Sequence, residues 1–165
     1  MIEYRKIDIS EKQELSELIY TVQAGLERKE FFVSFSDKEI EAMFDENNAV
    51  TYGAYANGKL VGTAQFYLGD EFVDEIKAAL GVKETLAGEF GGVLVLPEYR
   101  ENGIMKQFSS ILISEAKSRN YDYIVSVAHP ENIASNKSIL AMGAKLMKTD
   151  YLGKYFRNMY LLALK

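Results

Sequence analysis

The sequence contains no cysteine among its 165 residues. Without thiols the chain can form neither a disulfide scaffold nor a thiolate metal site, and it has no cysteine nucleophile. No apolar run approaches the roughly 20 residues that are needed to span a bilayer. The first residues also lack the basic start and apolar segment of a signal peptide. We therefore expect a protein with no membrane association and a cytoplasmic location.

The chain also has fewer basic than acidic residues. The chain has 19 Lys and Arg against 24 Asp and Glu, which gives a net charge of −5. Nucleic-acid binding generally needs a basic surface, so we expect no nucleic-acid partner. Two phosphate-binding motifs are also missing, because neither G-x-x-x-x-G-K-S/T nor G-x-G-x-x-G occurs. The sequence is thus neither a P-loop nor a dinucleotide-binding sequence.

The residues that are present are those of an ordinary globular protein. Hydrophobic residues make up 48% of the chain and charged residues 26%, a balance that disfavours disorder. The length suits one hydrophobic core, and we find no internal repeat, low-complexity tract or linker. The sequence therefore predicts a single domain that covers residues 1–165.

Strand-like and helix-like patterns alternate along the chain. Apolar alternation or continuous apolar runs predict strands at residues 2–9, 50–56, 59–67, 89–96, 121–128, 145–150 and 157–164. Apolar residues at helical spacing predict helices at residues 11–26, 36–44, 70–80, 104–117 and 130–143. We predict an α/β fold with a mixed central β-sheet of about seven strands flanked by helices.

Local motifs mark where several of these elements begin. Ser10 is the expected cap of the first helix. Ser36 with Glu39 forms the pattern of a capping box at the second helix. Asn57-Gly58 separates two strand-like runs and readily adopts positive φ at both positions, so it predicts a hairpin.

One strand-to-helix turn carries features of an anion site. In the stretch VLVLPEYRENGIMK, from residue 93 to residue 106, a buried strand ends at Pro97 and a helix begins after Gly103. The first turn of a helix has unpaired N–H groups that, with the helix dipole, favour a phosphate. Arg100 adds a positive side chain. On composition alone, an ordinary turn with a surface arginine remains the alternative.

Two motifs resemble those of one family. Residues 95–104, VLPEYRENGI, resemble the acetyl-CoA motif of the GNAT superfamily of N-acyltransferases, Q/R-x-x-G-x-G/A after a V-x-P strand end. Residues 129–143 are similar to the family's N-x-x-S/A segment, and the order of elements matches over nearly the whole chain. The resemblance implies a GNAT-like N-acetyltransferase that transfers an acetyl group from acetyl-CoA to a primary amine by direct attack in a ternary complex, without a metal.

The resemblance also assigns cofactor-binding residues. Leu94 and Val95 would offer backbone groups to the pantetheine arm of coenzyme A, and Asn132 and Ser135 would face the cofactor from the following helix. The turn would bind the pyrophosphate. Its residues are Arg100, Glu101, Asn102, Gly103, Ile104 and Met105.

Two positions depart from the family pattern. Met105 replaces a glycine or alanine and would crowd the phosphate site unless its side chain points away. Ile139 stands where many relatives carry the tyrosine that protonates the departing thiolate. These departures leave open a non-catalytic acyl-CoA-binding or regulatory domain of the same fold. A second alternative is a small α/β interaction module that binds no nucleotide.

Two residues are candidates for proton transfer. Glu89 shares side-chain parity with Val93 and Val95 on the strand that leads to the turn, and a similar glutamate is catalytic in some relatives. A strand-end carboxylate in solvent is the alternative. His129 is the only histidine and follows a parallel-type strand, where α/β sites collect. The alternative interpretation is that His129 is only an exposed loop residue before a proline.

Aromatic and acidic residues have less specific interpretations. The loop at residues 31–35 has three phenylalanines that either cover the acceptor site or pack onto the core. For Tyr151, Tyr155 and Phe156 we expect core packing or a dimer contact rather than a substrate pocket. Asp70 and the acidic residues after it are expected on a solvated face. The acceptor is a small-molecule or peptide amine, and a homodimer is left open.

Overall fold

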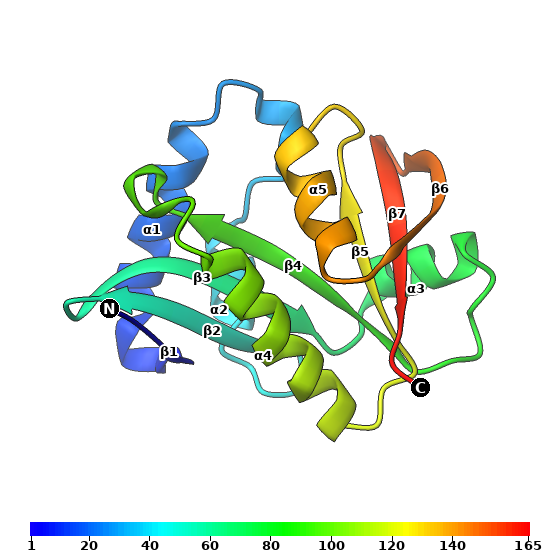
Figure 1. Cartoon of the computed structure of the whole chain (residues 1–165), viewed down its shortest axis with the longest axis horizontal. Coiled ribbons are helices and arrows are strands. Elements are labelled where there is room, and N and C mark those ends of the chain that lie inside the picture. The colour runs from blue at the N-terminus through cyan, green and yellow to red at the C-terminus, as the bar shows by residue number, and fades with distance from the viewer.

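The computed structural model describes all residues 1–165. Seven strands form one mixed sheet in the order β1-β2-β3-β4-β5-β7-β6 (Figure 1). The strands are β1 (Ile2–Lys6), β2 (Ala49–Ala56), β3 (Lys59–Tyr67), β4 (Ala87–Val95), β5 (Tyr123–Ala128), β6 (Lys145–Leu152) and β7 (Tyr155–Ala163). The helices are α1 (Lys12–Ala24), α2 (Asp37–Ala42), α3 (Glu71–Ala79), α4 (Ile104–Ser118) and α5 (Ile133–Ala141). The predicted fold class is confirmed.

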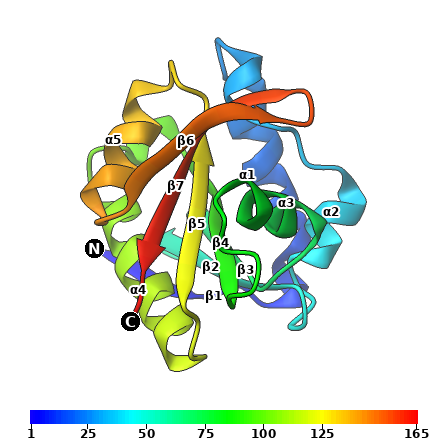
Figure 2. The same cartoon turned by 90° about the vertical axis from the view of Figure 1, so that its right-hand side faces the viewer.

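Helices cover both faces of the sheet. The view along the sheet in Figure 2 shows α4 and α5 on one side and α1, α2 and α3 on the other. The largest buried cluster contains 24 residues, mostly from α1, α2, α4 and the strands β2 to β5. A smaller cluster lies between α3 and the strands β5 and β7, around Ile76, Val125 and Met159. None of the helices combines the length and apolarity needed to cross a membrane.

The local motifs mostly act as their chemistry predicts. Ser36 Oγ accepts the Glu39 N–H at 3.2 Å while the Glu39 carboxylate accepts the Ser36 N–H, so the capping box forms. Asn57 and Gly58 both adopt positive φ in the β2–β3 hairpin. The predicted cap of the first helix is wrong. Asp8, not Ser10, accepts the N–H two residues on and opens a short 3₁₀ turn that leads into α1.

That turn also shortens the first strand. The predicted strand at 2–9 ends at Lys6 because the Asp8 side chain takes backbone hydrogen bonds for the turn. The predicted strand at 121–128 begins instead at Tyr123. Tyr121 lies in the turn after α4, where its N–H donates to the Ala116 carbonyl at 3.1 Å. These shifts reflect side-chain and backbone bonds that override apolar pattern at element ends.

The central strands β4 and β5 separate part-way along their length. They are parallel neighbours only from Ala87 to Glu89, and the last pair joins Glu89 to Val125. The register of β3 and β4 also shifts by one residue, so β4 carries a bulge around Gly92, whose φ is 62°. Beyond Glu89 the β5-facing edge of β4 is therefore not paired in the sheet.

Candidate active site

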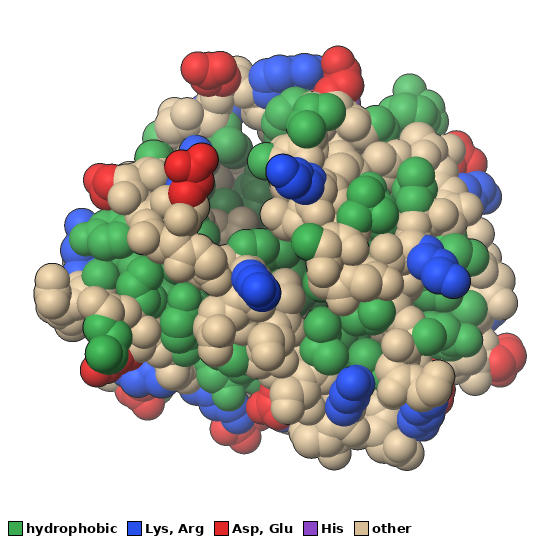
Figure 3. Space-filling model, in the orientation of Figure 1, with side chains coloured by type: hydrophobic (Ala, Val, Ile, Leu, Met, Phe, Trp, Pro, Cys, Tyr) green, Lys and Arg blue, Asp and Glu red, His purple; other side chains and the backbone are tan.

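Two cavities lie on opposite faces of the sheet and meet where β4 and β5 separate. The first, here called the groove, has a volume of about 400 Å³ and is bounded by β4, β5, α4 and α5. The second, the chamber, has a volume of about 450 Å³ and is bounded by β4, β7, α2 and the start of α3. Gly91, Gly92, Val127 and Ala128 line both cavities. Figure 3 shows the hollow on the α4–α5 face, above β4.

The groove ends at the turn before α4. Every backbone N–H from Glu101 to Lys106 lacks a hydrogen-bond partner, because the helical bonds begin with the Gln107 N–H to the Gly103 carbonyl at 3.0 Å. Gly103 has φ 74° and no atom near its missing Cβ, so the backbone there is open to a ligand. Arg100 lines the groove and has no ion-pair partner. This turn fits a diphosphate group.

The two departures from the family pattern have clear structural settings. The Met105 side chain packs against the main core and also forms part of the groove wall. Ile139 is 4% exposed and also lines the groove. The groove wall thus carries no hydroxyl at that position.

The open edge of β4 presents one backbone unit to the groove. The Leu96 N–H donates to the Val61 carbonyl of β3 at 2.9 Å. Successive N–H groups of a strand point to opposite edges, so the Val95 N–H points to the open β5 side. By the same alternation the backbone of Leu94 faces β3, although the residue is also part of the groove wall. The geometry thus fits Val95 but not the backbone of Leu94.

Asn132 and Ser135 lie in the groove wall, on the α5 side. Asn132 is the N-cap of α5, and its Oδ1 accepts the Ser135 N–H at 3.3 Å. Asn136 holds this end of the helix in place. Its amide donates to the carbonyls of His129 and Asn132 at 2.9 and 2.8 Å, and its Oδ1 accepts from the Asn158 side chain at 2.9 Å.

Glu89 lies in the chamber wall rather than in bulk solvent. A Cβ on Gly91 would stand 3.1 Å from Glu89 Oε2, so the carboxyl group lies over the glycine at the junction of the two cavities. No side chain or backbone group hydrogen-bonds to this carboxyl group. Burial, with a smaller contribution from the negative charge of Asp70, raises the pKa of Glu89 to about 8. A carboxyl group with this pKa suits general-base chemistry near neutral pH.

His129 is not in the wall of either cavity. Its Nδ1 accepts the Glu131 N–H at 3.1 Å, and its ring lies against the Phe31 ring with 5.0 Å between centroids. The structure therefore does not bring His129 together with Glu89. Its surroundings are those of a loop residue that packs on a neighbouring loop.

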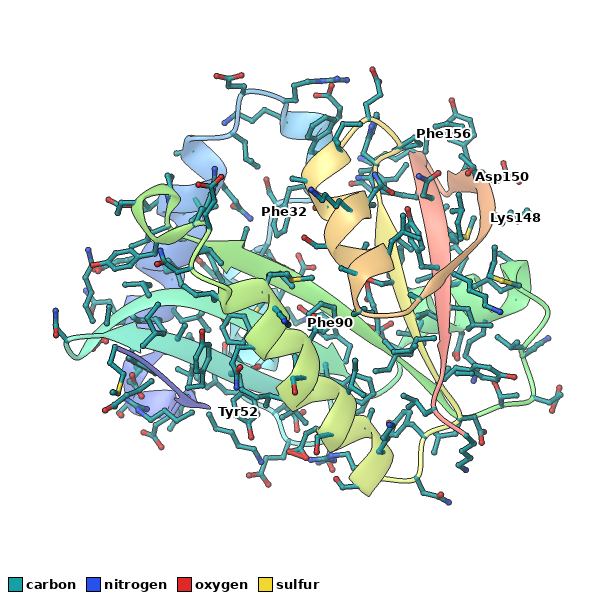
Figure 4. All side chains as sticks on the ribbon, viewed as in Figure 1. Phe32, Tyr52, Phe90, Lys148, Asp150 and Phe156 are labelled. Atoms are coloured by element: carbon teal, nitrogen blue, oxygen red, sulfur yellow. The ribbon has the colours of Figure 1, made fainter.

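The aromatic loop before α2 lines the two cavities and also packs onto the core. Phe31 and Phe32 line both cavities, whereas Phe32 and Phe35 also pack against the main core. Figure 4 shows Phe32 in the space between α1 and α5, above β4. The loop therefore forms part of the roof over the junction of the cavities.

The three aromatic residues Tyr151, Tyr155 and Phe156 do not lie in one environment. The Tyr151 and Phe156 rings lie against each other with 4.9 Å between centroids but are 64% and 39% exposed, so neither residue packs in the core, and the expected dimer contact stays a prediction. Figure 4 shows Phe156 near the start of β7, far from Phe32. Tyr155 lines the chamber, contrary to the expectation that this cluster lies outside a pocket.

Several chamber residues had no sequence signal. Asp70 is exposed, as expected, but it also caps α3 by accepting the Val73 N–H at 2.8 Å and lines the chamber. Tyr67 is the register partner of Glu89, and burial raises its pKa well above the usual value, with help from the charge of Glu89. Arg157 enters from β7. Only the pairing of distant strands places these side chains together.

With this geometry established, comparison with known proteins identifies the family. Residues 23–143 match the model of the acetyltransferase (GNAT) family. The chain belongs to the GNAT family. It is therefore an acyltransferase, which decides against an interaction module that binds no nucleotide. Enzymes of this family use acetyl-CoA as the acetyl donor.

Solved structures show the same fold over the full length of this acetyltransferase. An N-acetyltransferase from Staphylococcus aureus Mu50 is 20% identical, with a TM-score of 0.75 and coverage of 100% of this chain and 99% of that one. The ribosomal-protein-S18-alanine N-acetyltransferase of Escherichia coli is 14% identical, with a TM-score of 0.74 and coverage of 99% and 94%.

A third structure includes the cofactor. The protein yncA of Salmonella typhimurium, solved with acetyl-CoA, is 18% identical, with a TM-score of 0.73 and coverage of 99% and 94%. No curated protein sequence matches this acetyltransferase. Its His, Asp and Glu side chains form no group of three or more that could hold a metal ion.

Proposed function

We propose that this acetyltransferase is an N-acetyltransferase that acts on a primary amine in a ternary complex. Acetyl-CoA occupies the groove and the amine occupies the chamber. The observation that carries the proposal is that the two cavities meet at Gly91 and Gly92 on β4 and at Val127 and Ala128 on β5. The carboxyl group of Glu89 lies at that junction, on the chamber side.

The cofactor would be held mainly by backbone groups. The free N–H groups from Glu101 to Lys106, with Arg100, would bind the diphosphate. The pantetheine arm would follow the unpaired edge of β4 in the manner of an added strand. The Val95 N–H would donate to the thioester carbonyl and polarise it. Asn132 and Ser135 would form the opposite wall.

Glu89 is the proposed general base. A free alkylamine has a pKa near ~10 and is mostly protonated at neutral pH, so it needs a group that accepts its proton. Acetyl-CoA supplies the acetyl group as a thioester, and in the net reaction a C–N bond forms, the C–S bond breaks and the amine proton ends on the thiol. Ile139 cannot donate that proton, so the donor is a group other than the side chain at this position.

Direct attack is favoured over an acyl-enzyme. The chain has no cysteine to carry the acetyl group, and the residues shared by the proposed cofactor groove and acceptor chamber on β4 and β5 are glycine, valine and alanine, none of which is a nucleophile. Both substrates would therefore be bound together before transfer.

The test is a thiol-release assay with acetyl-CoA and a panel of primary amines. We expect amine-dependent release of coenzyme A, and we expect Glu89→Gln to lower kcat by about 10²–10⁴-fold while the Kd for coenzyme A is unchanged. Asp74→Asn on the exposed side of α3 is the matched control and should retain full activity. If no amine stimulates thiol release although coenzyme A binds, the proposal is wrong.

A further inference from the structure

Arg157 is a buried cation in the chamber that has no counter-charge. Its side chain is 5% exposed, yet it makes no ion pair with any carboxylate of the chain. Its two terminal nitrogens donate to backbone carbonyls, Nη1 to Phe156 at 2.9 Å and Nη2 to Glu30 at 3.0 Å. Two bonds to neutral oxygens leave the charge of the guanidinium unbalanced, and burying an unpaired charge is costly.

The position of Arg157 on β7 places its positive charge in the chamber wall. Glu89 pairs with Val125 of β5, and Val125 pairs with Leu161 of β7. Directly paired residues share a face, and Arg157 has the same side-chain parity as Leu161. Glu89 and Arg157 therefore project from the same face of the sheet, and both lie in the wall of the same cavity.

The remaining walls define what lies between these two groups. Aromatic side chains dominate them, with Phe35 and Phe72 on one side and Tyr155 beside Arg157. Arg157 lies over the Tyr155 ring at 5.2 Å from its centroid. Glu39 and Asp70 add carboxylates to the chamber wall, and neither forms an ion pair with the guanidinium. The chamber therefore offers an apolar space with a cationic group at one place and carboxyl groups at another.

The volume limits the size of the occupant. A cavity of about 450 Å³ lies in the small-molecule range. The fork of donors in a guanidinium matches a carboxylate geometrically, which a point charge does not. A ligand that carries an ammonium, a carboxylate and an apolar body is chemically complementary to these three kinds of wall group.

We propose that the acceptor of this acetyltransferase is an amino acid with an apolar or aromatic side chain, whose carboxylate binds Arg157 while its amine lies at Glu89. This inference rests on the proposed function, because it names the substrate class of the same site. Arg157 is a specificity-determining residue in this view. It also fastens the loop before α2 through the Glu30 carbonyl, so the test must separate recognition from loop support.

The test compares substrates that differ only in the carboxylate. Phenylalanine and leucine are assayed beside phenethylamine, isopentylamine and the two amino-acid amides, with wild type, Arg157→Gln and Arg157→Lys. Arg157→Gln removes the charge and shortens the side chain, so it also loses the bond that Nη2 makes to the Glu30 carbonyl, whereas Arg157→Lys keeps a charged donor of similar reach. For wild type we expect kcat/KM to be about 10–100-fold higher for the amino acids, the range of a charged hydrogen-bonded contact.

The Arg157→Gln variant tests whether the contact between Arg157 and the substrate carboxylate causes this preference for amino acids. Arg157→Gln should lower kcat/KM for the amino acids by about tenfold or more and leave the decarboxylated amines almost unchanged, with Arg157→Lys in between. A second readout is thermal: in the presence of coenzyme A, phenylalanine should raise the Tm of wild type but not of Arg157→Gln.

The outcomes separate this inference from the proposed function. If wild type acetylates the decarboxylated amines as well as the amino acids, the inference is wrong and N-acetylation stands. If Arg157→Gln lowers activity on both substrate classes in equal proportion, Arg157 acts only through the loop and the inference is again wrong. If only amines outside both classes are acetylated, this inference alone is wrong, and if no primary amine of the full panel is acetylated although coenzyme A binds, both proposals are overturned.

Discussion

The α-carbon of Gly92 lies against the side-chain amide of Gln65. A Cβ at Gly92 would stand 1.7 Å from Gln65 Oε1, and Gly92 has φ 62°. Gln65 is fully buried and is held in place by its own bond from Nε2 to Thr63 Oγ1 at 2.9 Å. This contact therefore requires glycine at the bulge where the two cavities meet.

We accordingly expect Gly92→Ala to destabilise the protein strongly. The left-handed conformation costs about 1–2 kcal/mol for a residue with a Cβ, and overpacking against a fixed neighbour costs about 1–3 kcal/mol more. Urea unfolding measures the sum. Gly58→Ala is the matched control, because its φ is also positive at 79° but nothing lies near the missing Cβ. Equal losses in the two variants would refute the role of Gln65.

Coenzyme A binding should depend on the turn before α4. Arg100→Ala removes a charge-assisted contact to the diphosphate, so we expect the Kd to rise about tenfold, with a smaller effect at high ionic strength. Isothermal titration of coenzyme A measures it. Lys117→Ala, near the C-terminal end of the same helix, is the charge-matched control. If Arg100→Ala and wild type bind equally, the phosphate site lies elsewhere.

The pH dependence of catalysis should report Glu89. With a pKa of about 8, this carboxyl group is mostly protonated at pH 7 in the free enzyme and becomes a base as the pH rises. The ratio of kcat/KM between wild type and Glu89→Gln should therefore increase about tenfold per pH unit below pH 8 and level off above it. Taking the ratio cancels the ionisation of the free amine. A ratio that is constant with pH would exclude Glu89 as the base.

The same group should make stability depend on pH. The folded-state pKa of Glu89 lies above its unfolded value of about 4.3, so the folded state binds its proton more tightly. Its contribution to stability is fully present below about pH 4.3 and is lost as the pH rises through about 8. Relative to Glu89→Gln, wild type should thus lose unfolding free energy between pH 5 and 8. Urea titrations across this range would show parallel curves if the carboxyl group were solvated.

Asn136 should be important for the stability of the groove wall. Its side chain donates to the carbonyls of His129 and Asn132 and accepts from Asn158 and Tyr160. Asn136→Ala leaves these groups without partners, so we expect a loss of about 2–3 kcal/mol of unfolding free energy and weaker coenzyme A binding. The exposed neighbour Lys137→Ala should change neither quantity. Equal stability of the two variants would show that water replaces the network.

The sequence by itself determined the elements whose signals are local. Apolar periodicity predicts helices and strands because one face of each must be buried, and short-range bonds define the capping box at Ser36 and the hairpin at Asn57-Gly58. The turn at Arg100–Met105 is likewise local, because its free N–H groups follow from the start of a helix. Resemblance to a family then added the cofactor and the order of the strands.

Only the tertiary structure decided what faces the acceptor. Arg157 follows Glu89 by 68 positions in the printed sequence, and the two reach one cavity because β5 pairs with both β4 and β7. His129 has the residue type of a base, yet the path of its loop leaves it outside both cavities. The raised pKa of Glu89 likewise arises from burial. Burial and cross-strand contact are properties of the assembled sheet, so no local pattern encodes them.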